Sequence, residues 1–316
     1  PRLQDPQTQI RLFVLSPGDP DSEVRGDFTV VDQDDETPYQ CISCAWGDVL
    51  DTTHIVVGGE RFTVTRSLFS ALRRIRSTQN PITLWADALC INQEDSEEKR
   101  LQVNKMFRIY SNCSHCFIWL GEIDTDRAGF SLETARATFT YLEAVVAASP
   151  EDPWPRDLST PASRLSIVSG LQALLECPCW SRIWTLQECV APVAATVLRG
   201  PLSMPWTSLL GAANKILHRV AEEWDDYMRE ITRKSRFTCV TVPVSVLGEE
   251  TKMGNSQCGI PALNLFWRYI QRHATDPRDR VYASIPSVSH ALESVKSSDY
   301  EAGYEDLYSR VTTDLI

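Results

Sequence analysis

The sequence predicts an α/β fold in which helices flank a parallel sheet, followed by a mostly helical carboxyl-terminal part. Short apolar runs in the first half of the 316 residues read as buried strands: "YQCISCAW" (39–46), "ITLWAD" (82–87) and "CFIWLG" (116–121). Helical stretches alternate with these strands, as in sheets built from βαβ units. Apolar residues make up 43% of the chain and charged residues 23%, the balance of a globular protein.

Turn and cap residues support the expected elements between the first two strands. The run "HIVVGGERFTV" (54–64) predicts a hairpin with Gly58 and Gly59 at its turn. Thr65 then serves as the N-cap of a helix. One face of this helix carries the apolar side chains of Leu68, Leu72 and Ile75.

The rest of the chain reads as a series of helices. We expect a helix that begins at Asp95, with Glu98 closing a capping box. Its core face would carry Val103, Met106, Phe107 and Tyr110. The remaining expected elements are helices at 132–147, 165–175, 206–236, 263–273 and from Tyr304, an apolar run at 194–200, and loops at 149–161 and 243–262. No clear linker precedes residue 201, so we expect residues 1–200 to form an α/β domain on which a helical extension, residues 201–316, packs.

Composition limits the classes of partner and the compartment. The net charge of −11 disfavours nonspecific binding to nucleic acid or to an anionic membrane. We find no apolar run of transmembrane length and no signal peptide. Ten cysteines in a chain of this length are too few for a disulfide framework and favour a reducing, cytoplasmic location.

Two cysteine pairs have the spacing of metal ligands, Cys41–Cys44 and Cys113–Cys116. Positions i and i+3 of a strand point to opposite faces, which argues against Cys41 and Cys44 sharing a metal. The sequence therefore predicts no metal site. It also lacks a P-loop, a G-x-G-x-x-G fingerprint, an H-E-x-x-H motif and a G-x-S-x-G motif, which argues against the enzyme classes that these motifs define.

Three polar clusters are expected at the carboxyl edge of the sheet, where open parallel sheets bind ligands. They comprise Ser43, Trp46, Gly47 and Asp48; then Asp87, Cys90, Asn92 and Gln93; then Arg182, Trp184, Gln187 and Glu188. Because the clusters are far apart in sequence and would share one edge, they predict a binding site.

Most of these residues also have a structural interpretation. Asp87 could cap the turn that follows it, the tryptophans could belong to the core, and Arg182 with Glu188 could form a structural ion pair. Cys90 would act as a nucleophile only beside a base, for which His115 is the one candidate. In "TDPRDR", a helix-capping role for Asp276, Arg278 and Asp279 is favoured over a place in the site.

Several longer motifs resemble those of the fungal heterokaryon-incompatibility (HET) domain. They are "YQCISCAWGD", "LWADALCINQEDSEEKRLQVNKMFRIYSNC", "CFIWLG" and "CWSRIWTLQE", flanked by "IRLFVLSPGD", "ATDPRDRVYASIPSV" and "SDYEAGYEDLY". The core match spans about residues 39–200. The chain departs from the family's Ala-Leu-Ser-Tyr at residues 41–44, and from its bulky apolar residue at Ala86. The change from tyrosine at Cys44 puts any role of that ring in doubt.

The resemblance implies a fold and an activity. HET proteins are implicated in nonself recognition and programmed cell death in fungi, and the domain has been likened to the flavodoxin-like Toll/interleukin-1 receptor (TIR) domain. Some TIR domains hydrolyse NAD with a glutamate four residues after a tryptophan. Ser181, Trp184 and Glu188 show nearly that pattern, with one extra residue between the serine and the tryptophan.

From this resemblance we expect Glu188 to be the catalytic carboxylate, stabilising an oxocarbenium-like state as in glycoside hydrolysis. Trp46 or Trp184 would stack on a base, and Ser43 and Asn92 would bind phosphate or ribose. Gly47, Asp87, Cys90 and Arg182 complete the expected substrate site. NAD would be a substrate and no cofactor is expected.

Three functional hypotheses follow. The first is hydrolysis of the N-glycosidic bond of NAD or a related nucleotide through Glu188. The second is a non-catalytic signalling module that associates with itself or with a partner protein of the HET or NLR type. The third is an enzyme acting on another small molecule of fungal metabolism through Cys90 or Asp87.

Overall fold

The computed structural model describes residues 1–123, 131–149, 161–223, 272–288 and 291–315. Within these ranges, nine strands form one mixed sheet: β1 (Gln9–Leu15), β2 (Arg25–Asp32), β3 (Gln40–Cys44), β4 (Thr52–Val57), β5 (Glu60–Thr65), β6 (Ile82–Trp85), β7 (His115–Trp119), β8 (Ala195–Arg199) and β9 (Leu202–Pro205). The strand order is β5-β4-β2-β1-β6-β3-β7-β8-β9.

The sheet is mixed rather than parallel throughout. Its central strands β6, β3, β7 and β8 are parallel neighbours, whereas β1 is antiparallel to both β2 and β6. The hairpins β4–β5 and β8–β9 add further antiparallel pairs. The connections inside these pairs are short, and only antiparallel strands can be joined without a long crossover. The prediction of a parallel sheet therefore holds for the central four strands and for the β2–β4 pair, but not for the rest of the sheet.

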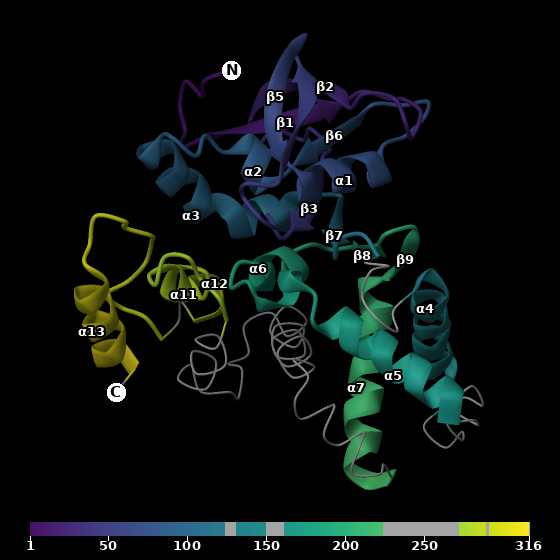
Figure 1. The fold of residues 1–316 in the computed structure, drawn as a ribbon. Coiled ribbons are helices and arrows are strands. Elements are labelled where there is room, and N and C mark those ends of the chain that lie inside the picture. Colours follow the sequence, from purple (N-terminus) through teal and green to yellow (C-terminus); the bar gives the residue numbers. More distant parts are fainter. Residues whose placement is uncertain (124–130, 150–160, 224–271, 289–290, 316) are drawn as a thin grey trace.

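Helices connect and cover the strands (Figure 1). They are α1 (Arg66–Ile75), α2 (Asp87–Cys90), α3 (Ser96–Asn112), α4 (Leu132–Ala147), α5 (Pro161–Leu175), the 3₁₀ turn η2 (Pro178–Ser181), α6 (Thr185–Val190), α7 (Trp206–Glu223), α11 (Asp279–Tyr282), α12 (Ile285–Val288) and α13 (Tyr304–Leu315). Helix α3 packs on α6, which also contacts β3 and β7. The expected helix at 263–273 and loop at 243–262 lie outside the described residues, except for 272–273. These two residues are not helical, and His273 instead forms an isolated bridge with Arg182.

Local sequence explains several element boundaries. Thr65 caps α1 as expected, its side chain accepting a hydrogen bond from the Leu68 N–H at 3.4 Å. Gly58 and Gly59 have φ values of 59° and 87°, the left-handed conformation that a two-residue hairpin turn requires. Asp95 caps α3, but Glu98 does not close a capping box, because its carboxylate is bonded to Arg11 on β1 instead.

The expected domain boundary after residue 200 falls in the turn between β8 and β9, which pair in the same sheet. Two large apolar clusters fill most of the described interior, and a third, minor one joins Ala135 to Ala173. The largest lies around the sheet and includes Leu12, Trp85 and Trp119. The second joins Ile183 and Leu186 to the carboxyl-terminal segment, through residues that include Val281. No helix within the described ranges is long and apolar enough to cross a membrane.

Candidate functional site

A cavity of about 640 Å³ lies at the carboxyl ends of β3 and β6. Its walls come from the loop after β3, the start of α2, one side of α3, the stretch from η2 to α6, and the carboxyl-terminal segment with Tyr300. Because β6 lies on one side of β3 and β7 on the other, the strand order reverses at β3. Open α/β sheets bind ligands at such a reversal, and the volume is that of a small-molecule site.

The three predicted clusters converge here, but only in part. Trp46, Gly47, Asp48, Asp87, Gln93, Arg182 and Trp184 all line the cavity. Gly47 has a φ of 71°, so a left-handed turn carries the chain from β3 along the cavity rim. Five residues of these clusters do not line it, namely Ser43, Cys90, Asn92, Gln187 and Glu188.

Asp87 is the centre of the polar wall. One oxygen, Oδ2, accepts a hydrogen bond from the Trp46 indole at 3.0 Å and faces the Arg182 guanidinium at 3.4 Å. The other, Oδ1, accepts from the Ala88 N–H at 2.7 Å, so the expected capping role is also present. A single carboxylate thus connects the loop after β3, the start of α2 and the residue that follows η2.

Arg182 links two carboxylates. Its guanidinium donates to the Cys44 carbonyl oxygen as well as to Asp87. Burial opposes the charge on this side chain, but the pKa of Arg182 is nevertheless raised by Glu188 and Asp87. The cation is therefore held in place by the charges on both sides of it.

Glu188 lies behind this wall, on α6, with 1% of its surface exposed. The Ser43 hydroxyl donates to its Oε2 at 2.5 Å, and Oε1 has no hydrogen-bond partner among the described residues. Burial raises the pKa of Glu188 to about 7, against the lowering effect of Arg182. The expected catalytic carboxylate is thus next to the lining residues without itself facing the cavity.

Cys90 and Asn92 shape the turn after α2. Burial raises the pKa of the Cys90 thiol to about 12, so it stays protonated at neutral pH. Asn92 is exposed, and its side chain accepts from the Glu94 N–H at 3.2 Å. His115, the expected partner of Cys90, is hydrogen-bonded to Thr196. His115 is therefore not placed to activate Cys90 as a nucleophile.

Sequence reasoning missed part of the site. Lys99 on α3 and Tyr300 line the cavity, and so does Asp279, for which a capping role was favoured. Asp276 has the local role expected for this segment, since its carboxylate pairs with Arg278 at 2.7 Å. The sequence did contain a signal for Asp279. It is the second acidic residue of "TDPRDR" and, unlike Asp276, it is not paired with Arg278.

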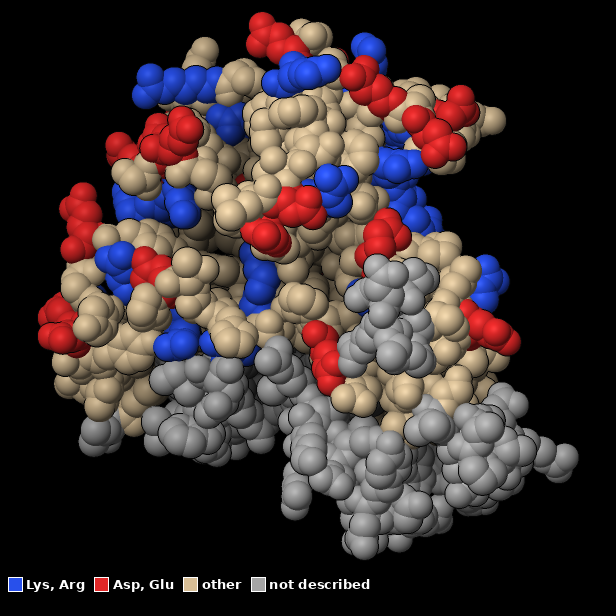
Figure 2. Space-filling view, in the orientation of Figure 1, with Lys and Arg blue, Asp and Glu red and all other residues tan. Residues whose placement is uncertain are grey.

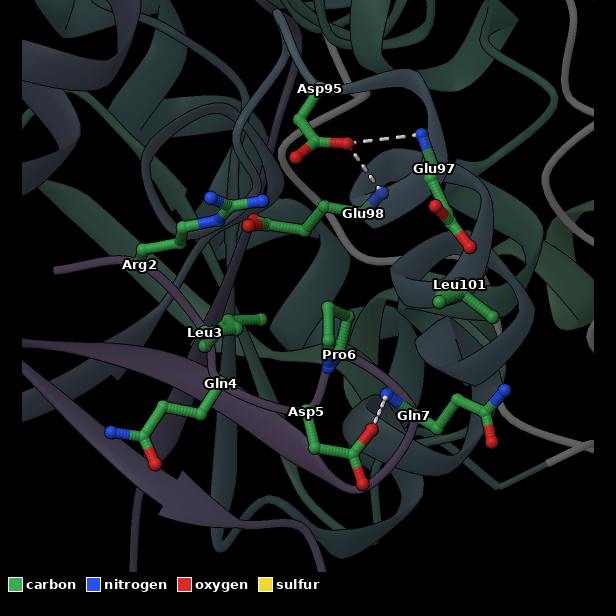
Figure 3. Close-up of a pocket in the computed structure, with 10 residues that line it drawn as sticks. All are labelled: Arg2, Leu3, Gln4, Asp5, Pro6, Gln7, Asp95, Glu97, Glu98 and Leu101. Atoms are coloured by element: carbon green, nitrogen blue, oxygen red, sulfur yellow. Dashed lines mark hydrogen bonds between the residues drawn. The ribbon is translucent and has the colours of Figure 1, made fainter.

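A second hollow of about 610 Å³ lies between the amino-terminal residues and the start of α3 (Figure 3). Three of its four carboxylates, those of Asp5, Asp95 and Glu98, are bonded to nearby groups. Asp5 accepts from the Gln7 N–H, Asp95 accepts from the first N–H groups of α3, and Glu98 pairs with Arg11. These bonds stabilise the local fold, and the hollow is remote from the ends of the parallel strands, so we place the candidate site in the first cavity.

The charge of the surface is mixed. Acidic and basic side chains are interspersed over the described part of the face in Figure 2. Among the residues that the structure describes, no three His, Cys, Asp or Glu side chains are placed to hold a metal ion. The cavity lining offers aspartates, Arg182, Lys99, His273 and aromatic rings.

Fold and cavity together define a mixed α/β domain with a candidate ligand site at the ends of its parallel strands. Residues 39–188 match the sequence model of the family described as Heterokaryon incompatibility protein (HET). This region of the chain is therefore similar to the HET domain, as its motifs indicate.

Two curated relatives support this similarity. The chain is 31% identical over 166 residues to Heterokaryon incompatibility protein 6, OR allele, of Neurospora crassa, a match that covers 48% of this chain and 24% of the relative. It is 24% identical over 110 residues to Vegetative incompatibility protein HET-E-1 of Podospora anserina, covering 35% of this chain and 6% of the relative. The chain therefore spans a quarter or less of either relative. No solved structure gave a significant match.

Proposed function

We propose that this domain acts in fungal incompatibility and cell death by hydrolysing the N-glycosidic bond of NAD or a related nucleotide in the cavity after β3 and β6. The names of the two relatives support the biological role. The observation that carries the chemical role is the cavity itself, in which a partly buried Asp87–Arg182 pair lies beside two tryptophans at the strand-order reversal.

The parallel strands support a TIR-like fold for this domain. Numbered along the chain, β3, β6, β7 and β8 are ordered 2-1-3-4 across the sheet. Flavodoxin-like sheets have this order, and they bind their ligand at the same reversal. The flanking antiparallel strands are additions at both sides of this core.

The lining residues suit the parts of a nucleotide. The rings of Trp46 and Trp184 offer stacking surfaces for a base, and Lys99 with Arg182 offers positive charge for phosphate. We assign the contact with ribose to Asp87, the carboxylate that lines the cavity. Glu188 lies behind it and, when it is ionised, adds a second negative charge that acts on Arg182 and on the developing cation.

The reaction breaks the bond between the nicotinamide nitrogen and C1 of the ribose. Water adds its oxygen to that carbon, nicotinamide leaves with the bonding electrons, and one proton is released. The positive charge that develops on the ribose is stabilised by nearby carboxylate, as in glycoside hydrolysis.

The test is nicotinamide release from NAD by purified wild type, Asp87→Asn and Glu188→Gln, at dilute and at crowded concentrations. Glu94→Gln serves as control, because Glu94 is exposed and does not line the cavity. We expect wild type and control to release nicotinamide, and each of the other variants to lose about 100-fold or more of the rate. A folded, concentrated wild type that releases none would contradict the proposal.

Self-association is the second candidate function, and one observation favours it. Val49 and Leu50, at the tip of the loop after β3, are 63% and 85% exposed beside the cavity. A pair of exposed apolar side chains on a loop suits contact with another copy or with a HET- or NLR-type partner. Under this alternative, Glu188→Gln keeps its effect in cells while Leu50→Asp abolishes it.

We further propose a cytoplasmic location. No disulfide joins the cysteines in the described part of the chain, which are Cys41, Cys44, Cys90, Cys113, Cys116, Cys177, Cys179 and Cys189. Free thiols suit a reducing compartment.

A further inference from the structure

Part of the cavity wall comes from the carboxyl-terminal segment, which lies outside the family-matched range of 39–188. The segment is docked at two places. The Gln187 side chain on α6 donates to the Ala283 carbonyl at 2.9 Å, and α11 lies beside α6 in Figure 1. The Ser298 N–H donates to the Asn104 side chain on α3 at 2.6 Å. This wall is therefore fixed to two helices, α3 and α6, of the domain that carries the rest of the cavity.

Two half-buried side chains of this wall, Asp279 and Tyr300, are bonded to each other where they line the cavity. The Tyr300 hydroxyl donates to Asp279 Oδ1 at 2.6 Å. The Tyr300 ring is held as well, because it packs edge-on against Tyr282 with ring centres 5.3 Å apart. The Arg278 guanidinium also lies over this ring, 5.3 Å from its centre. The pair is therefore a fixed part of the wall.

The Asp279–Tyr300 pair offers a ligand hydrogen-bond acceptors and no donor. An ionised carboxylate only accepts, and a phenol has a single proton to donate. Burial and the neighbouring Asp279 raise the pKa of Tyr300, so the phenol keeps its proton and uses it in the bond to Asp279. Burial also raises the pKa of Asp279, and the bond from Tyr300 opposes that rise and favours the ionised form. The lone pairs of the carboxylate and of the phenolic oxygen remain for a ligand.

The charges of the lining are divided between the walls. Asp279 forms no salt bridge with a residue that the structure describes, unlike Asp276, which pairs with Arg278 at 2.7 Å. The basic side chains Lys99 and Arg182 line the cavity from other elements, α3 and the turn after η2. A ligand that carries both hydroxyl groups and phosphate fits this division, with its hydroxyls at Asp279 and its phosphate at the basic side chains.

We propose that the Asp279–Tyr300 pair is a subsite for the two hydroxyl groups of a ribose, and that the charge of Asp279 excludes a ribose with a 2′-phosphate. A vicinal diol supplies the donors that this acceptor pair lacks, and a carboxylate at the 2′-hydroxyl is a common means of selecting NAD over its 2′-phosphorylated form. Asp87 is assigned to the ribose whose bond is cleaved, so Asp279 takes the other ribose of the dinucleotide. The choice of ligand rests on the proposed function.

Binding of ADP-ribose and of ADP-ribose 2′-phosphate tests the subsite without turnover, because neither ligand carries the bond that the proposed reaction breaks. The dissociation constants of both ligands are measured by titration calorimetry on the full chain. We expect wild type to bind ADP-ribose at least about tenfold more tightly than the phosphorylated ligand, since the 2′-phosphate would face the like charge of Asp279.

Three variants separate charge from structure. Asp279→Asn should weaken ADP-ribose binding by about tenfold and remove most of the preference, because the charge is gone and the amide can donate to phosphate. Tyr300→Phe should weaken ADP-ribose binding by about threefold but keep the preference, because the carboxylate remains. Asp276→Asn is the matched control in the same segment, and it should keep the preference, since Asp276 does not line the cavity. A merely structural role for Asp279 would weaken both ligands alike and leave their ratio unchanged.

The two proposals fail separately. A wild type that binds neither ligand, or binds both equally, would overturn the subsite even if it cleaves NAD, and so would a folded Asp279→Asn that keeps the wild-type preference. If wild type does not cleave NAD but shows a preference that depends on Asp279, the proposed function fails and the subsite stands. Should Asp279→Asn not fold, the preference of wild type and its retention in Tyr300→Phe decide.

Discussion

At the scale of single residues, the carboxyl of Glu188 combines deep burial with a nearby cation. One oxygen is bonded to Ser43 and the other has no partner in the described part of the chain. Burial favours the neutral form, and this effect exceeds the opposing effect of Arg182, so the pKa is raised from 4.5 to about 7. The folded protein therefore binds this proton more tightly than the unfolded chain does.

The raised pKa has a consequence for stability. The contribution of the bound proton is complete below pH 4.5, declines as the pH rises, and is lost above about pH 7. The shift corresponds to about 3 kcal/mol. Glu188→Gln lacks this titration, so we expect the unfolding free energy of wild type to fall relative to that of the variant between pH 5 and pH 8.

Urea unfolding of both proteins at several pH values measures this difference. Glu301→Gln, an exposed carboxyl elsewhere in the chain, controls for the loss of a surface charge. Parallel pH curves for wild type and Glu188→Gln would show that Glu188 ionises as freely in the folded state as in the unfolded state.

At the scale of elements, the turn after α2 depends on a strand that precedes the family-matched region. Arg11 on β1 donates to the Cys90 carbonyl at 2.7 Å and to the Glu98 carboxylate at 2.9 Å. Glu98 in turn accepts from the Asn92 N–H at 2.8 Å. The Arg11–Glu98 pair therefore forms hydrogen bonds with both ends of the turn that follows Asp87, at Cys90 and at Asn92.

Breaking this buried pair should be costly. The side chains of Arg11 and Glu98 are 7% and 2% exposed, whereas those of Arg25 and Glu23, also paired, are 63% and 51% exposed. We expect Arg11→Met to lower the unfolding free energy by about 3–5 kcal/mol, because it leaves a buried charge unpaired. Arg25→Met should lower it by less than about 1 kcal/mol. Equal effects in chemical denaturation would contradict this account.

This pair also shows where sequence reasoning stops. Local patterns predicted the α1 cap at Thr65, the β4–β5 hairpin and the bounds of α4, because neighbouring residues decide those features. Glu98 stands where a capping box expects it, but a strand 87 residues away takes its carboxylate. The strands β1, β2 and β9 were not predicted either, since pairing with distant strands decides their place.

The candidate site, too, could be predicted from the sequence only in part. The rule that ligands bind beyond parallel strand ends placed Trp46, Asp87, Arg182 and Trp184 correctly around one cavity. That rule does not say which side chains of a cluster face outward, so it did not separate Cys90 from Asp87. Asp279 reaches the site because a separate apolar cluster packs its segment against the rest of the protein. The spacing of residues along the chain does not predict that long-range contact.

At the scale of the whole molecule, the small cluster around Ile183 joins two parts of the chain. Ile183 is fully buried, and Leu186, Val281 and Tyr282 belong to the same cluster. This contact holds the segment with Asp279 against α6 and hence against the cavity. The cavity should therefore be sensitive to packing at a position that does not line it.

Ile183→Ala tests this dependence, with Ile55→Ala as its match. Both isoleucines are fully buried, but Ile55 belongs to the large cluster around the sheet. Each substitution removes the same atoms and should cost about 2–5 kcal/mol of unfolding free energy. Only Ile183→Ala should raise native-state amide hydrogen exchange in peptides that cover residues 273–300, because it loosens their docking while leaving the sheet packed. Equal exchange of these peptides in the two variants would mean that the hydrogen bonds from Ile183 and Gln187, and not the apolar cluster, hold the wall of the cavity in place.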